Sequence, residues 1–464
     1  TIHTITISKA DIADGGMKSF KQDDDSIILI TRDNSTYHAF DGKCPHAGAD
    51  LGTGLRCGNR VVCPWHHATF DSTDGTLLEP VAIEGLTQYE LSDDCDNLIV
   101  NTAAKMDKTV ENNQLNDTHT LIVGGGAAGF MTAHHLRNMG YGGKISIISK
   151  DDKAPYNRTL LSKAFLAGDM AEEKLLLGGA DWADKQNIDL QLNKTVSQVL
   201  PNENSIIINS DIDSDDSNEK LSPDFLVIAT GSAPTIPPIT GAKQKGVFTL
   251  RSMDDAKAIK VASHNKKVAI IGTGFIGMEV ASALSQAGTT ESITVIGQSG
   301  RVMENIVSET VSNALIKLHK DNGIKFVLNT QANEITADGS QLTGVSLDNG
   351  AHIEADIVIL GTGVSPRTDL IKEVNDPDGV QVDNHLQLRD GVYALGDIAK
   401  AEGKMGRMRI EHWRVALQHG LVTAAKILGD DTVHSLEERI PFFWTMQYGK
   451  SLRYSGHSAT ADHN

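Results

Sequence analysis

Two short pairs of cysteine and histidine within the first seventy residues constrain this chain more than any other feature. One residue separates Cys44 from His46, two separate Cys63 from His66, and sixteen residues lie between the pairs. A proline follows each cysteine and stiffens the turn, because it fixes φ and removes a backbone donor. Two such mixed pairs can supply two thiolates to one iron and two imidazoles to the other iron of a [2Fe–2S] cluster. The sequence therefore predicts that these four residues bind a binuclear iron–sulfur cluster.

Zinc is the alternative occupant of this ligand set, because zinc accepts the same thiolate and imidazole groups. Zinc fingers usually pair cysteine with cysteine and histidine with histidine. Here each loop contributes one residue of each kind, so the pattern favours iron–sulfur over zinc. A chance grouping of buried cysteine and histidine is a distant third.

The size and charge of the chain limit the functions that it can have. Its 464 residues are enough for two or three domains, and its net charge of −18 disfavours nucleic acid and anionic membranes as partners. No apolar run approaches the roughly 18 residues of a membrane span. Only four cysteines occur and no secretory-signal pattern opens the sequence. These features favour a cytoplasmic location, with the mitochondrion as the alternative.

The texture of the sequence changes near residue 119. Residues 1–102 contain short apolar segments between Gly, Asp and Asn turns, which predicts a small all-β domain. Residues 103–118 are polar and aperiodic, which suggests a linker. From His119 onward, predicted strands and helices alternate, which is typical of an α/β protein with a parallel sheet.

Two glycine-rich loops about 150 residues apart predict two dinucleotide-binding units. Residues 124–129 (GGGAAG) follow the apolar strand 120–123, and residues 272–277 (GTGFIG) follow the strand 267–271. The glycines allow a tight turn and close approach to a pyrophosphate, and the helix that follows stabilises the phosphate charge. One such loop is weak evidence, but two in the same context are strong. The predicted cofactor-contacting residues are Gly124, Gly126, Ala127, Ala128, Gly129, Gly272, Gly274, Phe275, Ile276 and Gly277.

An acidic residue at the end of the next strand commonly binds the ribose of a dinucleotide. After strand 144–148 the candidates are Asp151 and Asp152, although Lys150 is nearer to the expected point. After strand 292–296 the expected place holds Gly297. Both units therefore depart from the common pattern, and the second departure affects the choice of nicotinamide cofactor.

Two further strands end in turns that suit a flavin site. One strand leads into Ala229, Thr230 and Gly231, and another leads into Gly396 and Asp397. Asp397 could accept hydrogen bonds from sugar-chain hydroxyls, but an ordinary strand end explains either turn equally well when it is taken alone.

A helix is expected over residues 411–428, and its N-terminus would offer partial positive charge to a flavin ring. Trp413 lies on the apolar face of this helix. A plain core position explains this tryptophan equally well.

With these motifs in place, the chain resembles known families over nearly its whole length. Residues 119–464 resemble the flavin-dependent pyridine nucleotide oxidoreductases, specifically the ferredoxin reductases of oxygenase systems and the apoptosis-inducing factor family. Residues 1–102 resemble Rieske ferredoxins, and the joined arrangement is similar to Rieske-containing apoptosis-inducing-factor-like proteins. The motifs that carry the resemblance are CPHAGADLG, CPWHHATFD, GGGAAG, PYNRTLLSK, ATGSAP, GTGFIGMEVA, GTGVSP and ALGDIA.

The resemblance implies a multidomain fold. A small all-β Rieske domain is followed by an α/β flavoprotein with two dinucleotide-binding domains of the glutathione-reductase type. The implied divisions are a Rieske domain (1–102), a linker (103–118), an FAD-binding domain in two parts (119–248 and 366–438), an NAD(P)-binding domain (249–365) and the start of a C-terminal α+β domain (439–464), which stops short.

The resemblance also implies FAD at the first glycine loop and NAD(P)H at the second. In the family, the lysine of the PYxRPxLSK motif lies beside the isoalloxazine ring and pairs with the glutamate after the second loop; here these are Lys163 and Glu279. A cation near the ring favours the reduced, anionic flavin, and a carboxylate tunes that cation. Arg158 would lie along the FAD. The other implied cofactor positions are Asp151, Ala229, Thr230, Gly231, Gly363, Gly396, Asp397, His412 and Trp413.

The expected function is that of an NAD(P)H-dependent oxidoreductase. Electrons would pass from NAD(P)H through FAD to the Rieske cluster and on to an acceptor that the sequence does not identify, with a protein as one candidate. A redox-sensing or signalling protein with incidental NAD(P)H oxidation is the alternative. Dithiol chemistry is excluded because no cysteine follows Cys95.

The choice between NADH and NADPH rests on one substitution. Gly297 stands where NADH-preferring relatives have a glutamate, and it leaves room for a 2′-phosphate. Arg301, four residues further on, is within reach of that phosphate. We therefore expect weak discrimination between the two nicotinamides.

Overall fold

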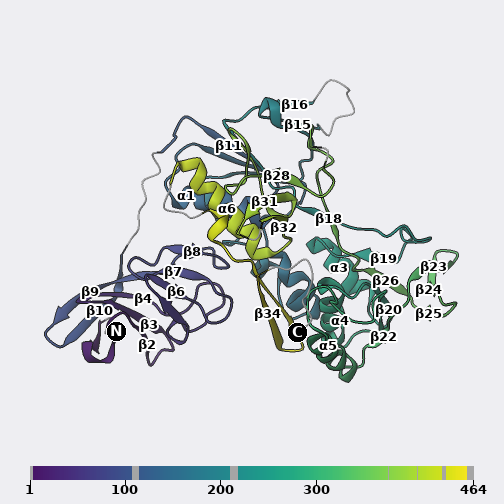
Figure 1. Cartoon of the computed structure of the whole chain (residues 1–464), viewed down its shortest axis with the longest axis horizontal. Helices are drawn as coiled ribbons and strands as arrows, with labels where there is room; N and C mark the ends of the chain where they lie inside the picture. Colours follow the sequence, from purple (N-terminus) through teal and green to yellow (C-terminus); the bar gives the residue numbers. More distant parts are fainter. Residues whose placement is uncertain are drawn as a thin grey trace. The chain divides into compact units, whose positions relative to one another are not determined.

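The computed structural model describes residues 4–106, 114–209, 218–374, 376–404, 406–430 and 435–456 (Figure 1). These residues form two compact units. The first unit comprises residues 4–106 and 114–116 together with residues 135–142 and 428–430. The second unit comprises the other described residues between 117 and 456.

The first unit is built mainly from two antiparallel sheets, drawn in purple and blue in Figure 1. The larger sheet contains, in spatial order, β1 (Thr4–Ser8), β10 (Asn97–Lys105), β9 (Gln88–Asp94), β4 (Thr36–Asp41), β3 (Ile27–Asp33) and β2 (Met17–Lys21). The smaller sheet contains β5 (Leu55–Cys57), β6 (Arg60–Val62), β7 (Thr69–Asp71) and β8 (Leu77–Glu79), and the short helices are η1 (Lys9–Asp11) and η2 (Leu51–Thr53).

Burial on both faces explains the apolar character of β3. Ile28 and Ile30 pack in one cluster with Leu98 and Val100 of β10, while the intervening Leu29 is also fully buried. A strand buried on both faces reads as a continuous apolar run rather than an alternating one. The expected all-β N-terminal domain is therefore confirmed.

The end of this unit falls in the segment expected to be a linker. Strand β10 extends to Lys105, three residues into the segment 103–118. Residues 107–113 of that segment lie outside the described residues.

The second unit contains two parallel sheets, which confirms the expected α/β architecture. The first has the order β13 (Asp189–Gln191), β12 (Lys144–Ile148), β11 (His119–Val123), β17 (Phe225–Ile228), β30 (Val392–Ala394) and β29 (Gln387–Arg389), of which only β29 runs antiparallel to its neighbour. The second, wholly parallel, has the order β19 (Val247–Thr249), β26 (Ile357–Leu360), β20 (Lys267–Ile271), β21 (Ser292–Ile296) and β22 (Lys325–Val327).

Helices accompany these sheets, and Figure 1 shows α3, α4 and α5 beside the strands of the second. The α-helices are α1 (Ala127–Asn138), α2 (Trp182–Lys185), α3 (Met253–Ala262), α4 (Phe275–Ala287), α5 (Glu309–Asp321) and α6 (Trp413–Leu428). The short helices are η3 (Arg158–Leu160), η4 (Leu161–Phe165), η5 (Glu172–Leu175), η6 (Pro201–Glu203), η7 (Gly396–Ile398) and η8 (Leu436–Glu438). No helix of the described residues is both long and apolar enough to cross a membrane.

Five smaller sheets complete this unit. They are β14 (Val196–Leu200) with β15 (Ser205–Ile208) and β16 (Glu219–Leu221), β18 (Ser232–Pro234) with β27 (Val364–Pro366), β23 (Ala332–Asp338) with β24 (Gln341–Leu347) and β25 (His352–Glu354), β28 (Val380–Val382) with β31 (Ala399–Gly403) and β32 (Gly406–Arg409), and β33 (Phe442–Gln447) with β34 (Lys450–Ser455).

The first parallel sheet is assembled from distant parts of the chain. Strand β17 pairs with β11 on one side and with β30 on the other. Strand β30 follows the whole second sheet in sequence. The strand ends of this sheet are therefore brought together from segments before and after the second sheet.

Helices α1 and α6 approach each other closely at Gly420, as the neighbouring ribbons in Figure 1 illustrate. A Cβ added at Gly420 would lie 2.7 Å from Cβ of Met131 and 2.8 Å from the carbonyl oxygen of Ala128. Both contacts are shorter than real Cβ atoms make, so the absence of a side chain allows this helix packing.

We expect Gly420→Ala to destabilise the protein, although alanine ordinarily stabilises a helix interior relative to glycine by roughly 0.5–1 kcal/mol. Overpacking of this kind costs about 1–3 kcal/mol, so the net effect has the opposite sign. Chemical unfolding followed by far-UV circular dichroism measures it as a lower midpoint. Val261→Ala, at an 80% exposed position of α3, is the control and should shift the midpoint little. A midpoint raised by Gly420→Ala would contradict the close packing.

Candidate functional site

The two Cys–His pairs lie on two loops that have the same backbone arrangement. Cys44 donates its N–H to Ala49 O at 2.8 Å, and Gly48 donates to Cys44 O at 2.8 Å. In the other loop, Cys63 donates to Ala68 O at 2.8 Å, and His67 donates to Cys63 O at 3.2 Å. Each cysteine is thus fixed at the head of a matching tight turn.

The matching backbone of the two loops explains the position of His67 in its turn. Gly48 has φ +78° and His67 has φ +58°, so the two residues occupy the same left-handed position of their turns. Glycine adopts this conformation without strain, whereas other residues do so at a cost of about 1–2 kcal/mol. His67 is therefore used for its place in the turn, and it is His66 whose ring lies 4.7 Å from the ring of His46.

The four predicted ligands gather in a buried site. Cys44 and Cys63 are 2% and 1% exposed, and their side chains are hydrogen-bonded to each other. This hydrogen bond and burial raise the pKa of the Cys44 thiol, whereas backbone amides of His46 and Ala47 also donate to it and act in the opposite direction. Burial lowers the pKa of His46 to about 4, so this imidazole is neutral, as a metal ligand must be.

The four side chains form two like pairs. The two cysteine thiols are hydrogen-bonded to each other, and the rings of His46 and His66 lie 4.7 Å apart. A Cys2His2 zinc site needs four ligands around one ion, whereas each iron of a Rieske cluster takes two ligands from the protein. The donor set therefore fits the cluster, with cysteines on one side and histidines on the other.

The first glycine loop is shaped by close contacts of its backbone. Gly124 has φ +116°, and a Cβ there would lie 2.2 Å from the carbonyl oxygen of Ala229. A Cβ at Gly129 would lie 2.1 Å from the carbonyl oxygen of Gly124, so this glycine lets α1 begin directly against the strand end. A Cβ at Gly126 meets no atom within 4 Å, which leaves open space for a pyrophosphate at the start of α1. Of the other predicted residues, Ala127 and Ala128 lie at the start of α1, and Thr230 and Gly231 lie in the turn after β17.

The second glycine loop repeats this arrangement. A Cβ at Gly272 would lie 2.2 Å from the carbonyl oxygen of Gly361, and a Cβ at Gly277 would lie 2.2 Å from that of Gly272. Gly274 again faces open space and caps α4 without a side-chain hydrogen bond, so amides at this helix end are available to a phosphate. Phe275 and Ile276 form the first turn of α4. Gly363, expected near a cofactor, lies in the turn after β26 with φ +93°.

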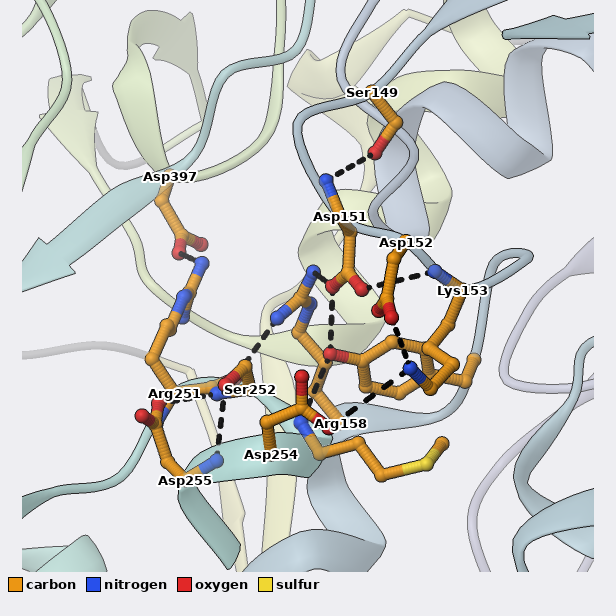
Figure 2. A network of polar contacts seen from close by, with 12 residues as sticks. Ser149, Asp151, Asp152, Lys153, Arg158, Arg251, Ser252, Asp254, Asp255 and Asp397 are labelled. Carbon is orange, nitrogen blue, oxygen red and sulfur yellow. Dashed lines mark hydrogen bonds and ion pairs between the residues drawn. The ribbon is translucent and has the colours of Figure 1, made fainter. Parts of the chain in front are cut away.

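The predicted acidic residue that follows the first glycine loop, Asp151, is held in a polar network (Figure 2). Asp151 accepts hydrogen bonds from the Tyr156 hydroxyl at 2.8 Å and from Arg158 Nη2 at 3.1 Å. Arg158 also donates to the carbonyl oxygen of Arg251 at 2.8 Å. The alternative candidate, Asp152, pairs instead with Lys153 at 2.5 Å. Asp151 is thus the acidic residue that the structure connects to Arg158.

A second acidic residue of the predicted site, Asp397, has partners of its own. It accepts hydrogen bonds from Arg251 Nη2 at 3.0 Å and from Ser232 Oγ at 2.7 Å, and Figure 2 shows Arg251 directed at it. The neighbouring Gly396, with φ +74°, donates its N–H to His419 Nδ1 at 3.1 Å. Burial lowers the pKa of His419 to about 3, so this ring is neutral and accepts at Nδ1.

Lys163 and Glu279 form a buried ion pair. Lys163 lies in the π-helical turn η4, and its Nζ is 2.8 Å from Glu279 Oε2 and 2.9 Å from the carbonyl oxygen of Thr159. The Glu279 side chain is only 5% exposed and that of Lys163 is 16% exposed. The pairing expected from the resemblance is therefore present, and it is buried rather than on the surface.

Glu279 has two further donors, which sequence reasoning missed. The hydroxyl of Ser162 donates to Oε2, and the hydroxyl of Thr445 in β33 donates to Oε1 at 2.7 Å. Both oxygens of the carboxylate are therefore satisfied inside the protein, as burial of a charge requires.

His412 and Trp413 lie at the start of α6, which begins at Trp413 rather than at residue 411. The ring of His412 is 4.5 Å from that of Phe443 in β33, and Phe443 is 4.5 Å from Phe275 of the second glycine loop. Aromatic side chains thus connect the N-termini of α4 and α6.

Thr273 narrows the space beside Gly297. A Cβ at residue 297 would lie 2.4 Å from Cγ2 of Thr273, so a glutamate here would require Thr273 to move. Arg301 Nε lies 3.5 Å from Glu304 Oε1. The arginine expected near a 2′-phosphate is therefore within reach of a carboxylate that competes for it.

Comparisons with known proteins identify the families of the two parts of the chain. Residues 118–420 match the family model described as pyridine nucleotide-disulphide oxidoreductase, and residues 4–90 match that of the Rieske [2Fe-2S] domain. The chain belongs to the pyridine nucleotide-disulphide oxidoreductase family and carries a Rieske domain at its N-terminal side. It is an FAD-dependent NAD(P)H oxidoreductase of the ferredoxin reductase type.

Individual relatives are similar to the oxidoreductase part of the chain or to nearly the whole chain. Apoptosis-inducing factor 3 of Homo sapiens is 28% identical over 94% of this chain and 73% of that protein. Rhodocoxin reductase of Rhodococcus erythropolis is 32% identical over 74% of this chain and 79% of that protein. The crystal structure of the covalent putidaredoxin reductase–putidaredoxin complex is similar with a TM-score of 0.67 and 29% identity, covering 74% of this chain and 81% of that chain.

Several residues of the site were not expected from the sequence. The Gly-x-Gly pattern at residues 361–363, which resembles the start of the two longer loops, is the signal that could have identified Gly361. Arg251 precedes α3, and no local pattern marked it as a partner of Asp397. Ser162 stands beside Lys163 in the PYNRTLLSK motif, whereas nothing in the sequence around Thr445 pointed to Glu279.

We expect the purified protein to contain about two irons and about two acid-labile sulfides per chain. Cys63→Ser and His66→Ala should abolish the cluster, because each removes a ligand. His67→Gly is the matched control: it should keep the cluster, because glycine suits the left-handed position at least as well. Iron and sulfide analysis with electron paramagnetic resonance (EPR) measures these outcomes. One equivalent of zinc without iron, or loss of the cluster in His67→Gly alone, would contradict the assignment.

Proposed function

We propose that this chain oxidises NAD(P)H and passes the electrons through FAD to its own Rieske domain, from which they leave to an acceptor. The observation that carries the proposal is the buried Lys163–Glu279 pair, in a chain whose first unit also assembles the two Cys–His pairs. Fixed charge of this kind in a water-poor site is what a reaction that builds up negative charge requires.

The residues divide the work of binding and orientation. Backbone amides of the second glycine loop and of α4 would hold the pyrophosphate of NAD(P)H, and those of the first loop and α1 would hold that of FAD. Glu279 and the carbonyl oxygen of Thr159 direct the ammonium of Lys163. FAD, when bound, supplies the conversion of a two-electron hydride donor into single-electron transfers.

The Rieske domain takes the place that a separate carrier has in the relatives. Rhodocoxin reductase and the putidaredoxin reductase–putidaredoxin complex are named for such carriers. Here the carrier is part of the same polypeptide, which favours internal transfer because the two units are held at high effective concentration. A small redox protein is the acceptor class that this comparison supports.

A redox-sensing or signalling role is the second candidate. It is favoured by similarity to apoptosis-inducing factor 3 over 94% of the chain. Steady-state turnover separates the two functions: an oxidoreductase turns over typically 1–10³ times per second with an artificial acceptor, whereas a sensor reduced once per signal does not.

Anaerobic rapid mixing with NAD(P)H tests the internal relay. Flavin absorbance should bleach first, and the EPR signal of the reduced cluster should follow. His66→Ala should abolish the cluster signal and leave flavin bleaching intact, because only the N-terminal unit has lost a ligand. Lys163→Met should slow both by about tenfold or more, because it removes the fixed cation. A cluster that stays oxidised over many turnovers while the flavin is fully reduced would contradict the relay.

The nicotinamide preference is expected to be weak. The kcat/KM values for NADH and NADPH should differ by less than about a hundredfold, or about 2.7 kcal/mol, because residue 297 offers no carboxylate to the 2′-hydroxyl. Arg301→Ala should lower kcat/KM for NADPH by about tenfold and leave that for NADH within about twofold. Glu304→Gln is the matched variant and should favour NADPH, since it removes the carboxylate 3.5 Å from Arg301. Equal effects of Arg301→Ala on both substrates would exclude Arg301 from phosphate recognition.

A further inference from the structure

A buried chain of hydrogen bonds reaches Glu279 at the carboxylate oxygen other than the one that Lys163 approaches. Its members are His319 of α5, Gln447 and Thr445 of β33, and Glu279 of α4. His319 Nε2 lies 2.7 Å from Gln447 Oε1, and Gln447 Nε2 donates to Thr445 Oγ1 at 3.2 Å. Thr445 Oγ1 is 2.7 Å from Glu279 Oε1. The first three side chains are at most 1% exposed and Glu279 is 5% exposed, so water does not compete for these bonds.

The direction of these bonds follows from the donors available. The amide of Gln447 gives its N–H to Thr445, so its oxygen accepts from the N–H of His319. Burial lowers the pKa of His319, so the ring is neutral with its proton on Nε2, and its Nδ1 has no hydrogen-bond partner in the described part of the chain. The single hydroxyl proton of Thr445 is then left for Glu279.

The same carboxylate is held on its other oxygen by the turn that carries Lys163. Ser162 and Lys163 both approach Oε2, the latter at 2.8 Å. The two oxygens are equivalent, so only a half-turn of the carboxylate preserves these contacts, and any smaller rotation moves Oε1 away from Thr445 and Oε2 away from Lys163. The bond from Thr445 therefore helps to fix the plane of the carboxylate that faces Lys163.

The hairpin β33–β34 is attached to α4 at points on both sides of this bond. Tyr448 N donates to Ser282 Oγ at 3.2 Å, and the ring of Phe443 lies 4.5 Å from that of Phe275. Thr445 lies between these contacts in sequence, so its position is set by the docking of the hairpin. A segment that carries none of the nucleotide-binding motifs thus contributes a donor to the ion pair.

We infer that Thr445 is a positioning residue for the Lys163–Glu279 pair. The hairpin β33–β34 therefore contributes to the flavin-reducing site. The inference rests on the proposed function, because the pair is the group that directs positive charge in that reaction. Without the Thr445 hydroxyl, the carboxylate swings between its donors and Lys163 is no longer held in one place.

Thr445→Val is the decisive variant, since it replaces the hydroxyl by a methyl of similar size. In the holoprotein, the rate of flavin reduction at saturating NADH should fall by about tenfold, while the half-saturating NADH concentration stays within about twofold. The midpoint potential of the bound flavin should become more negative, because the nearby cation is less well placed. Thr445→Ser, which keeps the hydroxyl, should restore both values to within about twofold of the unsubstituted protein.

Thr31→Val is the matched control. Thr31 is a fully buried threonine of the first unit whose hydroxyl donates to the carbonyl oxygen of Ser72 at 2.6 Å. Its replacement removes one buried hydrogen bond, as Thr445→Val does, but should leave flavin reduction and the flavin potential unchanged. Bound FAD, measured by absorbance, verifies that each variant is folded and loaded.

Gln447→Glu keeps the inference testable if Thr445→Val does not retain FAD. A carboxylate at residue 447 cannot donate to Thr445 and competes for its proton, so flavin reduction should slow by about threefold or more. Unchanged rate and potential in FAD-loaded Thr445→Val, or in Gln447→Glu when that variant alone is loaded, would overturn the role of Thr445. If NAD(P)H fails to reduce the flavin of the unsubstituted protein, the proposed function is wrong; the potential, measured by dye-coupled reductive titration, then still decides the inference.

Discussion

The buried ion pair between Lys163 and Glu279 is the interaction on which the second unit depends. Removing a carboxylate from water is costly unless its attraction to a cation and hydrogen bonds at both oxygens offset the loss. Glu279 has these partners in Lys163, Ser162 and Thr445, which come from η4 and β33. Loss of one charge of such a pair typically costs about 3–5 kcal/mol. Two segments distant in sequence, η4 and β33, must therefore meet at one residue of α4.

The two dinucleotide-binding units use the same backbone geometry to bring a strand end against the glycine loop. Gly124 faces the carbonyl oxygen of Ala229, and Gly272 faces that of Gly361, in each case at a distance that no side chain permits. The neighbouring strand end thus contacts the loop backbone directly, and open space remains beside Gly126 and Gly274 at the helix starts. The repeat is steric in origin, which explains why glycine is needed at these positions whichever dinucleotide is bound.

Features of the site that depend on one residue type could be predicted from the sequence, and those that depend on distant contacts could not. The glycine loops and the Cys–His pairs can be recognised in the sequence because few residues can replace glycine or bind iron. The role of His67 could not be predicted from the sequence, since its left-handed conformation is explained only by comparison with Gly48 in the matching loop. Thr445 contacts a residue 166 positions away, and an ordinary strand threonine carries no signal of such a contact.

The position of Thr445 has a consequence for how the site forms. The close contacts that shape the two glycine loops come from Ala229 and Gly361, and neither residue belongs to the hairpin β33–β34. The donors to Glu279 are not local, because one precedes it by 117 positions and another follows it by 166. The buried carboxylate becomes fully satisfied only after the hairpin β33–β34 docks on α4. The ability to bind nucleotides and the final geometry of the ion pair are therefore separable properties of the chain, and the second depends on a segment outside both dinucleotide-binding loops.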